Sequence, residues 1–289
     1  MFGLPVQVTA CLSVLFLASL DTCGSCKTNA RWQRLSGAFQ FSTVSVGPSG
    51  VWGITSKEGY TAHRVGTYGT SGSTNGTEWN RITESDKGAL RQLSVGDGAI
   101  WGITVHGNVA CRGGITKDAV FGTYWLAWAN KRRDIAVSAK GQLVGISEDG
   151  HFMYREGLNS QCTSKGNWVG TRSELSLSRI SVGAAGIWAV DDQQNVFYRP
   201  GTLGDNGAVG NGWQHVPGFL KTISVGTSHV IGVSPNQHIW RRDGVTETNP
   251  GGTKWVQIPG TLVDVDTTDD VCSVWGVQEN GSMWMGTFS

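Results

Sequence analysis

Charge is scarce in this sequence. Asp, Glu, Lys and Arg make up 16% of the 289 residues, and the formal net charge is only +1. Globular domains usually carry charges at about a quarter of their positions. Proteins that hold nucleic acid through a basic field need a large positive excess, which this chain does not have. The composition therefore argues against a nucleic-acid partner.

Helical periodicity and catalytic motifs are also missing. No stretch repeats apolar residues with the 3.6-residue period of a long helix. The six histidines are scattered, and H-E-x-x-H, G-x-S-x-G, P-loop and dinucleotide-binding patterns are absent. We therefore predict that the protein is not an enzyme. A glycan hydrolase remains an alternative, because two carboxylates that meet only in space leave no motif.

Long apolar runs are confined to the N-terminus. Residues 11–20 form an apolar core of signal-peptide length, too short to span a membrane. We predict a signal peptide over residues 1–22, with cleavage between 18 and 24, and a secreted mature chain over 23–289. No lysine or arginine precedes the apolar core, which is unusual for such a signal. No other run is long enough for a membrane span.

Glycine and tryptophan are abundant, with 42 and 13 copies, and they mark a repeat. A tryptophan opens each of six similar units that recur about every 45 residues. The six residues are Trp32, Trp79, Trp125, Trp168, Trp213 and Trp255. Within the units a Ser-Val-Gly strand, a Trp-Gly strand and a strand ending in arginine follow in order. Four short strands per repeat of this length predict an all-β fold, a six-bladed β-propeller forming a single domain.

The chain ends suggest how the ring closes. The last unit stops after its third strand, 282–285, and the first begins with an extra strand, 31–34. Pairing the two would complete the last blade and remove an exposed edge. Cys23 or Cys26 could bridge to Cys272 across this closure. Cys111 and Cys162 fall in adjacent units and could form a second bridge, in keeping with secretion.

The repeated motifs resemble the tectonin repeat, the unit of tectonin-type propeller lectins such as the fish egg lectins and the tachylectin-1 group. The match is clearest at Trp213, Val216-Pro-Gly218, Ile223-Ser-Val-Gly226 and Arg242-Asp-Gly244. It covers the whole predicted mature chain, although the third and fourth units depart from the pattern. The resemblance implies a multivalent lectin for N-acetylglucosamine-type or O-methylated sugars, lipopolysaccharide or other bacterial surface polysaccharide. It also implies a role in innate defence or egg protection.

Sugar sites combine an aromatic face with a few polar groups, which gives two sets of candidates. The tryptophans of the second strands could stack on sugars, or they could instead wedge between blades. The arginines that end the third strands could bind hydroxyls or phosphates, or they could be structural. Weaker candidates lie in loops. The full set is Trp52, Trp101, Trp188, Trp275, Arg64, Arg112, Arg155, Arg199, Arg242, Asp97 and His229.

Several other features stay open at this stage. Asn75 and Asn280 head glycosylation sequons. Asp264, Asp266, Asp269 and Asp270 cluster in the last unit and could hold calcium, or they could simply form a solvated loop. We otherwise expect no cofactor, and a homodimer is left open. The functional alternative to a lectin is a secreted protein-binding scaffold.

Overall fold

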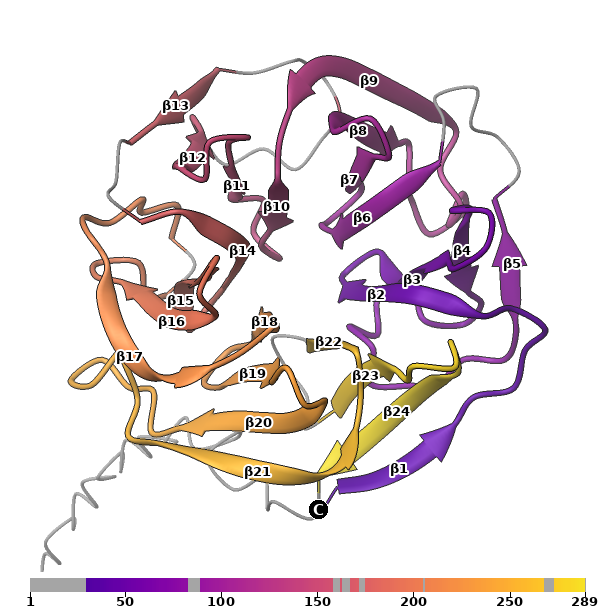
Figure 1. The fold of residues 1–289 in the computed structure, drawn as a ribbon. Helices are drawn as coiled ribbons and strands as arrows, with labels where there is room; N and C mark the ends of the chain where they lie inside the picture. Colours follow the sequence, from indigo (N-terminus) through magenta and orange to yellow (C-terminus); the bar gives the residue numbers. More distant parts are fainter. Residues whose placement is uncertain are drawn as a thin grey trace, which may run out of the picture.

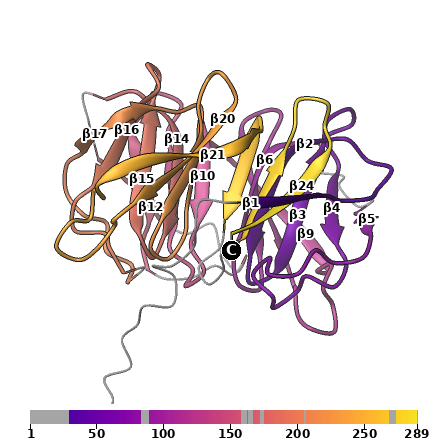
Figure 2. The ribbon, with the colours of Figure 1, turned by 90° about the horizontal axis from the view of Figure 1, so that it is seen from below.

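The computed structural model describes residues 30–82, 89–157, 162, 167–171, 175–204, 206–267 and 273–288. These residues form 24 strands and no helix, arranged as six four-stranded antiparallel sheets around a central channel (Figure 1). Seen from the side, the sheets form a short, thick cylinder (Figure 2). The prediction of a six-bladed β-propeller is confirmed. Among the described residues there is no helix long and apolar enough to cross a membrane.

In each blade the strands follow one another from the innermost, next to the channel, to the outermost. Blade 1 contains β2 (Phe41–Gly47), β3 (Gly50–Thr55), β4 (Thr61–Arg64) and β5 (Trp79–Arg81). Blade 2 contains β6 (Leu90–Val95), β7 (Ile100–Thr104), β8 (Asn108–Gly113) and β9 (Tyr124–Lys131). Blade 3 contains β10 (Asp134–Val137), β11 (Leu143–Ile146), β12 (Phe152–Arg155) and β13 (Trp168–Gly170).

The second half of the ring repeats this order. Blade 4 contains β14 (Leu177–Gly183), β15 (Gly186–Asp191), β16 (Asn195–Arg199) and β17 (Gln214–Phe219). Blade 5 contains β18 (Thr222–Val225), β19 (Val230–Val233), β20 (His238–Asp243) and β21 (Lys254–Thr261). Blade 6 contains β22 (Asp264–Thr267), β23 (Ser273–Val277), β24 (Met283–Phe288) and, as its outer strand, β1 (Ala30–Arg34).

The ring closes as the sequence predicts. β1 pairs antiparallel with β24, from Ala30 opposite Phe288 to Arg34 opposite Trp284, and the two strands lie side by side in both views (Figures 1 and 2). Each tryptophan that opens a repeat therefore lies on the outer strand of the blade before it, except Trp213, which directly precedes β17. β1 thus supplies the fourth strand of blade 6 and covers the edge that β24 would otherwise expose.

The core is divided among the six interfaces between blades. Each interface holds one cluster of buried apolar side chains, with residues contributed from both neighbours. The interface between blades 1 and 2, for example, packs Trp52 and Ile54 against Leu93, Val95 and Ile100. A single four-stranded sheet cannot bury both of its faces, so each blade depends on its neighbours for stability.

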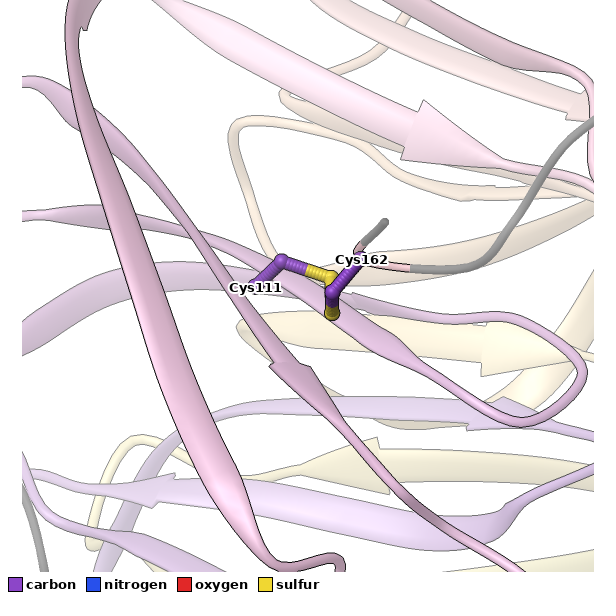
Figure 3. Close-up of a disulfide and its surroundings, with 2 residues drawn as sticks. All are labelled: Cys111 and Cys162. Carbon is purple, nitrogen blue, oxygen red and sulfur yellow. A yellow bond between two sulfur atoms is a disulfide. The ribbon is translucent and has the colours of Figure 1, made fainter. Parts of the chain in front are cut away.

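A disulfide links Cys111 on β8 to Cys162, with a Cα–Cα distance of 5.7 Å (Figure 3). Both cysteines are fully buried in the cluster between blades 2 and 3. This bridge was one of the two predicted from the sequence, and it is confirmed. Cys23, Cys26 and Cys272, like the proposed signal peptide, lie outside the described residues.

Candidate functional site

The tryptophans of the second strands are buried. Trp52, Trp188 and Trp275 have no exposed surface, and Trp101 is 1% exposed. Each packs into the cluster shared with the next blade. Stacking on a sugar needs an exposed ring face. This corrects the expectation that these indoles are sugar platforms, because they serve as wedges between blades.

The repeated arginines are equally inaccessible. All five are at most 8% exposed: Arg64, Arg112, Arg155, Arg199 and Arg242. In four of them Nε donates to a backbone carbonyl oxygen of the loop before the outer strand, at Asn75, Phe121, Val209 and Gly251. The guanidinium groups of the same four also lie 5.1–5.5 Å from the ring centroid of the outer-strand tryptophan. The expectation that these arginines bind sugar is corrected, because all five are buried. The four hold their own blades together, and Arg155 lies over the ring of Trp101 in blade 2 at 5.2 Å.

A glycine directly follows each of these four carbonyl groups, and its backbone conformation requires a residue without a side chain. Gly76, Gly122, Gly210 and Gly252 all have φ between +57° and +68°. A Cβ at any of the four would lie within 2.8 Å of a backbone carbonyl oxygen. The arginine and the glycine therefore form one repeated structural unit, which we call the arginine clip.

The two loop candidates differ in accessibility. His229 is 8% exposed, and its Nε2 lies 3.2 Å from Thr267 Oγ1. Burial lowers the pKa of His229 to about 4, so the ring is neutral and faces the interior rather than a ligand. Asp97 is exposed and remains a candidate.

The serine of the Ser-Val-Gly motif has a role that the sequence did not reveal. Its hydroxyl oxygen accepts the backbone N–H of the first strand in the next blade. Ser45, Ser94, Ser181 and Ser224 accept from Val95, Val137, Val225 and Thr267 at 2.9–3.2 Å. Asp266 replaces the serine in blade 6 and accepts from Val46 N at 2.7 Å. Only blade 3, with Ala136, interrupts this serine ring.

The serine ring lines a central channel with a cavity of about 340 Å³. Asp134, Asp264 and Asp266 are fixed in its wall by backbone N–H and hydroxyl donors of the neighbouring blades. Burial raises the pKa of Asp134 and of Asp266 to about 6 and also raises the pKa of Asp264. These carboxyl groups thus join adjacent blades along the channel wall.

The calcium candidates receive no support from this arrangement. Asp264 and Asp266 face N–H and O–H donors rather than other oxygen ligands. No group of three or more His, Cys, Asp or Glu side chains is placed to hold a metal ion within the described part of the chain. Asp269 and Asp270 lie outside it.

An open apolar pocket of about 480 Å³ lies on the outer flank of blade 5. Residues 218–220, at the end of β17 and just beyond it, and the turn 234–236 form its sides. The indoles of Trp240 and Trp255 line it between them. Phe219 on the rim is 63% exposed. Polar groups lie at the other rim, where Ser234 Oγ is 2.5 Å from Asn236 Oδ1 and accepts Trp240 Nε1–H at 3.2 Å.

The Pro-Gly pair of the repeat shapes this pocket. Trp255 Nε1 donates to the carbonyl oxygen of Pro217 at 2.8 Å. A Cβ on Gly218, which has φ of +154°, would lie 2.7 Å from that nitrogen. Glycine is therefore needed for the indole of blade 5 to reach the end of β17 in blade 4.

Blade 6 repeats the same frame. Trp32 Nε1 donates to the carbonyl oxygen of Pro259 at 2.7 Å, and Gly260 lies beneath the indole. Trp284 stands opposite Gly276 on β23, as Trp240 stands opposite Gly232 on β19. Trp284 Nε1 donates to Ser282 Oγ at 2.9 Å. Trp32 and Trp284 are both partly exposed, so this blade presents a second pair of indoles in the same arrangement.

The other blades do not offer this pair. The position paired with the second-strand small residue holds Ala62, Ala110, Met153 and Phe197 in blades 1 to 4. Trp240 and Trp284 were not among the predicted site residues, because the candidates were residue types that recur in most units. The available signal was the opposite one, an aromatic residue that appears at a repeat position in only some of the copies.

Comparisons with known proteins agree with this architecture. The tectonin domain model matches residues 6–133 and 128–279. The chain is 26% identical to the perivitellin-2 31 kDa subunit of Pomacea maculata over 257 residues, covering 84% of each protein. It is 27% identical over 117 residues to the fish-egg lectin of Cyprinus carpio, covering 40% of this chain and 48% of that lectin.

Solved structures show the fold alone. YCF48 from Cyanidioschyzon merolae superposes with a TM-score of 0.53 at 14% identity, covering 89% of this chain and 85% of that one. The family model, in contrast, matches nearly the whole chain through the repeat itself. The chain belongs to the tectonin domain family.

Proposed function

We propose that the protein is a secreted lectin that binds N-acetylglucosamine-type or O-methylated glycans, including bacterial surface polysaccharide, without chemical turnover. The observation that carries this proposal is the aromatic pocket on blade 5. The fish-egg lectin among its relatives supports the ligand class, and together with the perivitellin-2 subunit it favours a role in eggs or defence.

The pocket has the chemistry that such a sugar needs. A pyranose presents C–H groups on one face, which pack against the indole faces of Trp240 and Trp255. An N-acetyl or O-methyl group adds a methyl that fits the apolar side formed by Phe219 and Pro235. Asn236 at the exposed rim supplies polar atoms for hydroxyl groups.

Two similar sites on one ring would bind a repeating glycan more tightly than one. Once blade 5 is occupied, binding at blade 6 becomes effectively intramolecular. The indoles of Trp240 and Trp284 belong to adjacent blades, so one polysaccharide chain or two chains of a surface could engage both. When both indole pairs are open, this avidity favours binding to a repeating polysaccharide.

A glycan array with the full-length secreted protein tests the proposal. We expect binding to N-acetylated or O-methylated glycans. Trp240→Ala should weaken binding to a monovalent sugar at least tenfold, since an aromatic contact contributes about 1.5 kcal/mol beyond its area. Tyr124→Ala is the control, because Tyr124 is an exposed aromatic residue on the outer strand of blade 2, away from the pocket.

The outcomes separate the alternatives. No binding to any glycan at high protein density would overturn the proposal and favour a protein-binding scaffold. Binding that is equally weak in Trp240→Ala and Tyr124→Ala would place the sugar elsewhere. Hydrolysis of a bound glycan would identify an enzyme instead.

A further inference from the structure

We infer that Asn280 carries an N-linked glycan that covers the aromatic pair of blade 6 and regulates the number of open sites. The inference rests on the proposed function, since it requires entry into the secretory pathway and sugar binding by the indole pairs. The first sugar of such a glycan is N-acetylglucosamine, and it would be attached beside the indoles of blade 6, which are proposed to bind that class of sugar.

The two sequons of the chain lie in different environments. In N-glycosylation the amide nitrogen Nδ2 bonds to C1 of the N-acetylglucosamine of a lipid-linked oligosaccharide, displacing the lipid pyrophosphate and losing one proton. The residue must stay accessible in the folded protein. Asn75 is partly buried, its Nδ2 donates to Gln33 Oε1 at 3.1 Å, and its carbonyl oxygen is held by the clip of Arg64. The structure therefore disfavours Asn75.

Asn280 has the opposite character. It is exposed at the tip of the turn between β23 and β24. Its Oδ1 accepts the backbone N–H of Ser282 at 2.9 Å, whereas its Nδ2 has no partner among the described residues. Gly281 follows Asn280 with φ of +80°, a backbone conformation that suits a tight turn. The modified atom is therefore free.

The sequon is joined directly to the aromatic pair. Ser282, the hydroxyl residue of the sequon, accepts Trp284 Nε1–H at 2.9 Å and lies 3.2 Å from Gln278 Oε1. Asn280 occupies the place that Asn236 occupies in blade 5, where that asparagine lines the pocket with Trp240. A sugar on Asn280 Nδ2 thus starts at the rim of the site, and its N-acetyl group lies within reach of the indoles of Trp284 and Trp32.

The consequence is a difference between the two blades. The turn of blade 5 reads Asn236-Gln237-His238, which is not a sequon, so its pocket stays open. In blade 6 the attached sugar competes in cis with any external glycan, at the high effective concentration of an intramolecular ligand. The glycosylated protein would present one open aromatic pocket, and the unmodified protein two.

The first test is mass mapping of the full chain secreted from a eukaryotic host. We expect one N-glycan, which disappears in Asn280→Gln and persists in Asn75→Gln. An unmodified Asn280 in the secreted wild-type protein would overturn the inference, whatever its sugar binding. A glycan only at Asn75 would overturn it as well.

The second test measures dissociation from a surface coated with N-acetylglucosamine polymer. We expect Asn280→Gln, and wild type deglycosylated by peptide N-glycosidase, to dissociate at least tenfold more slowly than the glycosylated protein, because both blades can then bind. Unchanged dissociation with a glycan present at Asn280 would refute the covering of the site. Absence of binding in every form would refute the proposed function instead, with the mass measurement still reporting on the modification.

Discussion

Blade 5 and blade 1 share the arginine clip but differ at the position opposite the second-strand glycine. Both end their third strand in an arginine that donates to a loop carbonyl oxygen, Arg242 to Gly251 at 2.9 Å and Arg64 to Asn75 at 2.7 Å. Opposite the second-strand glycine, however, blade 5 has the partly exposed Trp240 and blade 1 has the fully buried Ala62. Only the first arrangement leaves an open pocket.

This difference separates two kinds of position in a repeat. A residue that recurs in nearly every copy makes the same contact at each interface, as the serine ring and the arginine clip do. A ligand needs an exposed surface, which the ring can present on some blades without disturbing the others. In this protein the residues that recur in most blades are packing residues. The candidate site contains an aromatic residue, Trp240, at a position that differs between blades.

The largest expected effect comes from removing the arginine clip. Arg242→Met and Arg64→Met should each lower the free energy of unfolding by about 3 kcal/mol, since charged hydrogen bonds to buried carbonyl groups are lost in both. Urea unfolding checks this, with Arg34→Met on the exposed part of β1 as the control. Markedly different losses of unfolding free energy in the two variants would contradict the view that the arginine clip has the same role in blades 1 and 5.

The second prediction concerns the pocket wall that blade 5 has and blade 3 does not. Gly218→Ala should cost about 2 kcal/mol and weaken sugar binding, because the new methyl displaces the indole of Trp255. The matched change Gly170→Ala on the outer strand of blade 3 meets only Met153 Cε at 3.5 Å and should be nearly neutral. Thermal unfolding and glycan titration of both variants measure the contrast, and equal effects would refute it.

The same distinction explains how much the sequence could reveal. The ring, its closure through β1 and the Cys111–Cys162 bridge were predictable because they depend on residues that repeat or on the position of a strand in the chain. The burial of Trp52 and Arg64 was not, since an indole or a guanidinium looks alike in sequence whether it faces a ligand or a neighbouring blade. Trp255 was identified as the opening residue of a repeat but was not among the sugar-binding candidates, although it lines the pocket.

The third prediction concerns how stability depends on pH through one residue in the channel and one in a blade interface. Asp266 has a folded pKa of about 6, above the unfolded value near 3.9, so the folded state binds its proton more tightly and gains stability as pH falls from about 7 to 4. Burial between Trp52 and Phe121 lowers the pKa of His63 to about 4, below its unfolded value near 6.5. Its contribution is therefore lost as pH falls from about 6.5 to 4.

Variants at the two sites should change this response in opposite directions. Asp266→Asn should steepen the loss of stability between pH 7 and 5, and His63→Phe should reduce it, each by about 1 kcal/mol relative to wild type. Urea unfolding at three pH values measures both. Parallel pH profiles for wild type and Asp266→Asn would show that the channel carboxylate does not titrate in this range.

The smallest expected effect lies in the serine ring, where blade 3 differs from its neighbours. Ser94→Ala removes the acceptor of Val137 N–H and should lower the free energy of unfolding by about 1 kcal/mol. Ala136 has no hydroxyl to offer Val182, the equivalent residue of blade 4. Ala136→Ser should therefore stabilise the protein by up to about 0.5 kcal/mol, once the cost of ordering the hydroxyl is subtracted. Because Asp134 already accepts Ile180 N–H at 2.9 Å, blades 3 and 4 have their own hydrogen bond at the channel wall. A destabilised Ala136→Ser would mean that this carboxylate replaces the serine rather than adding to it.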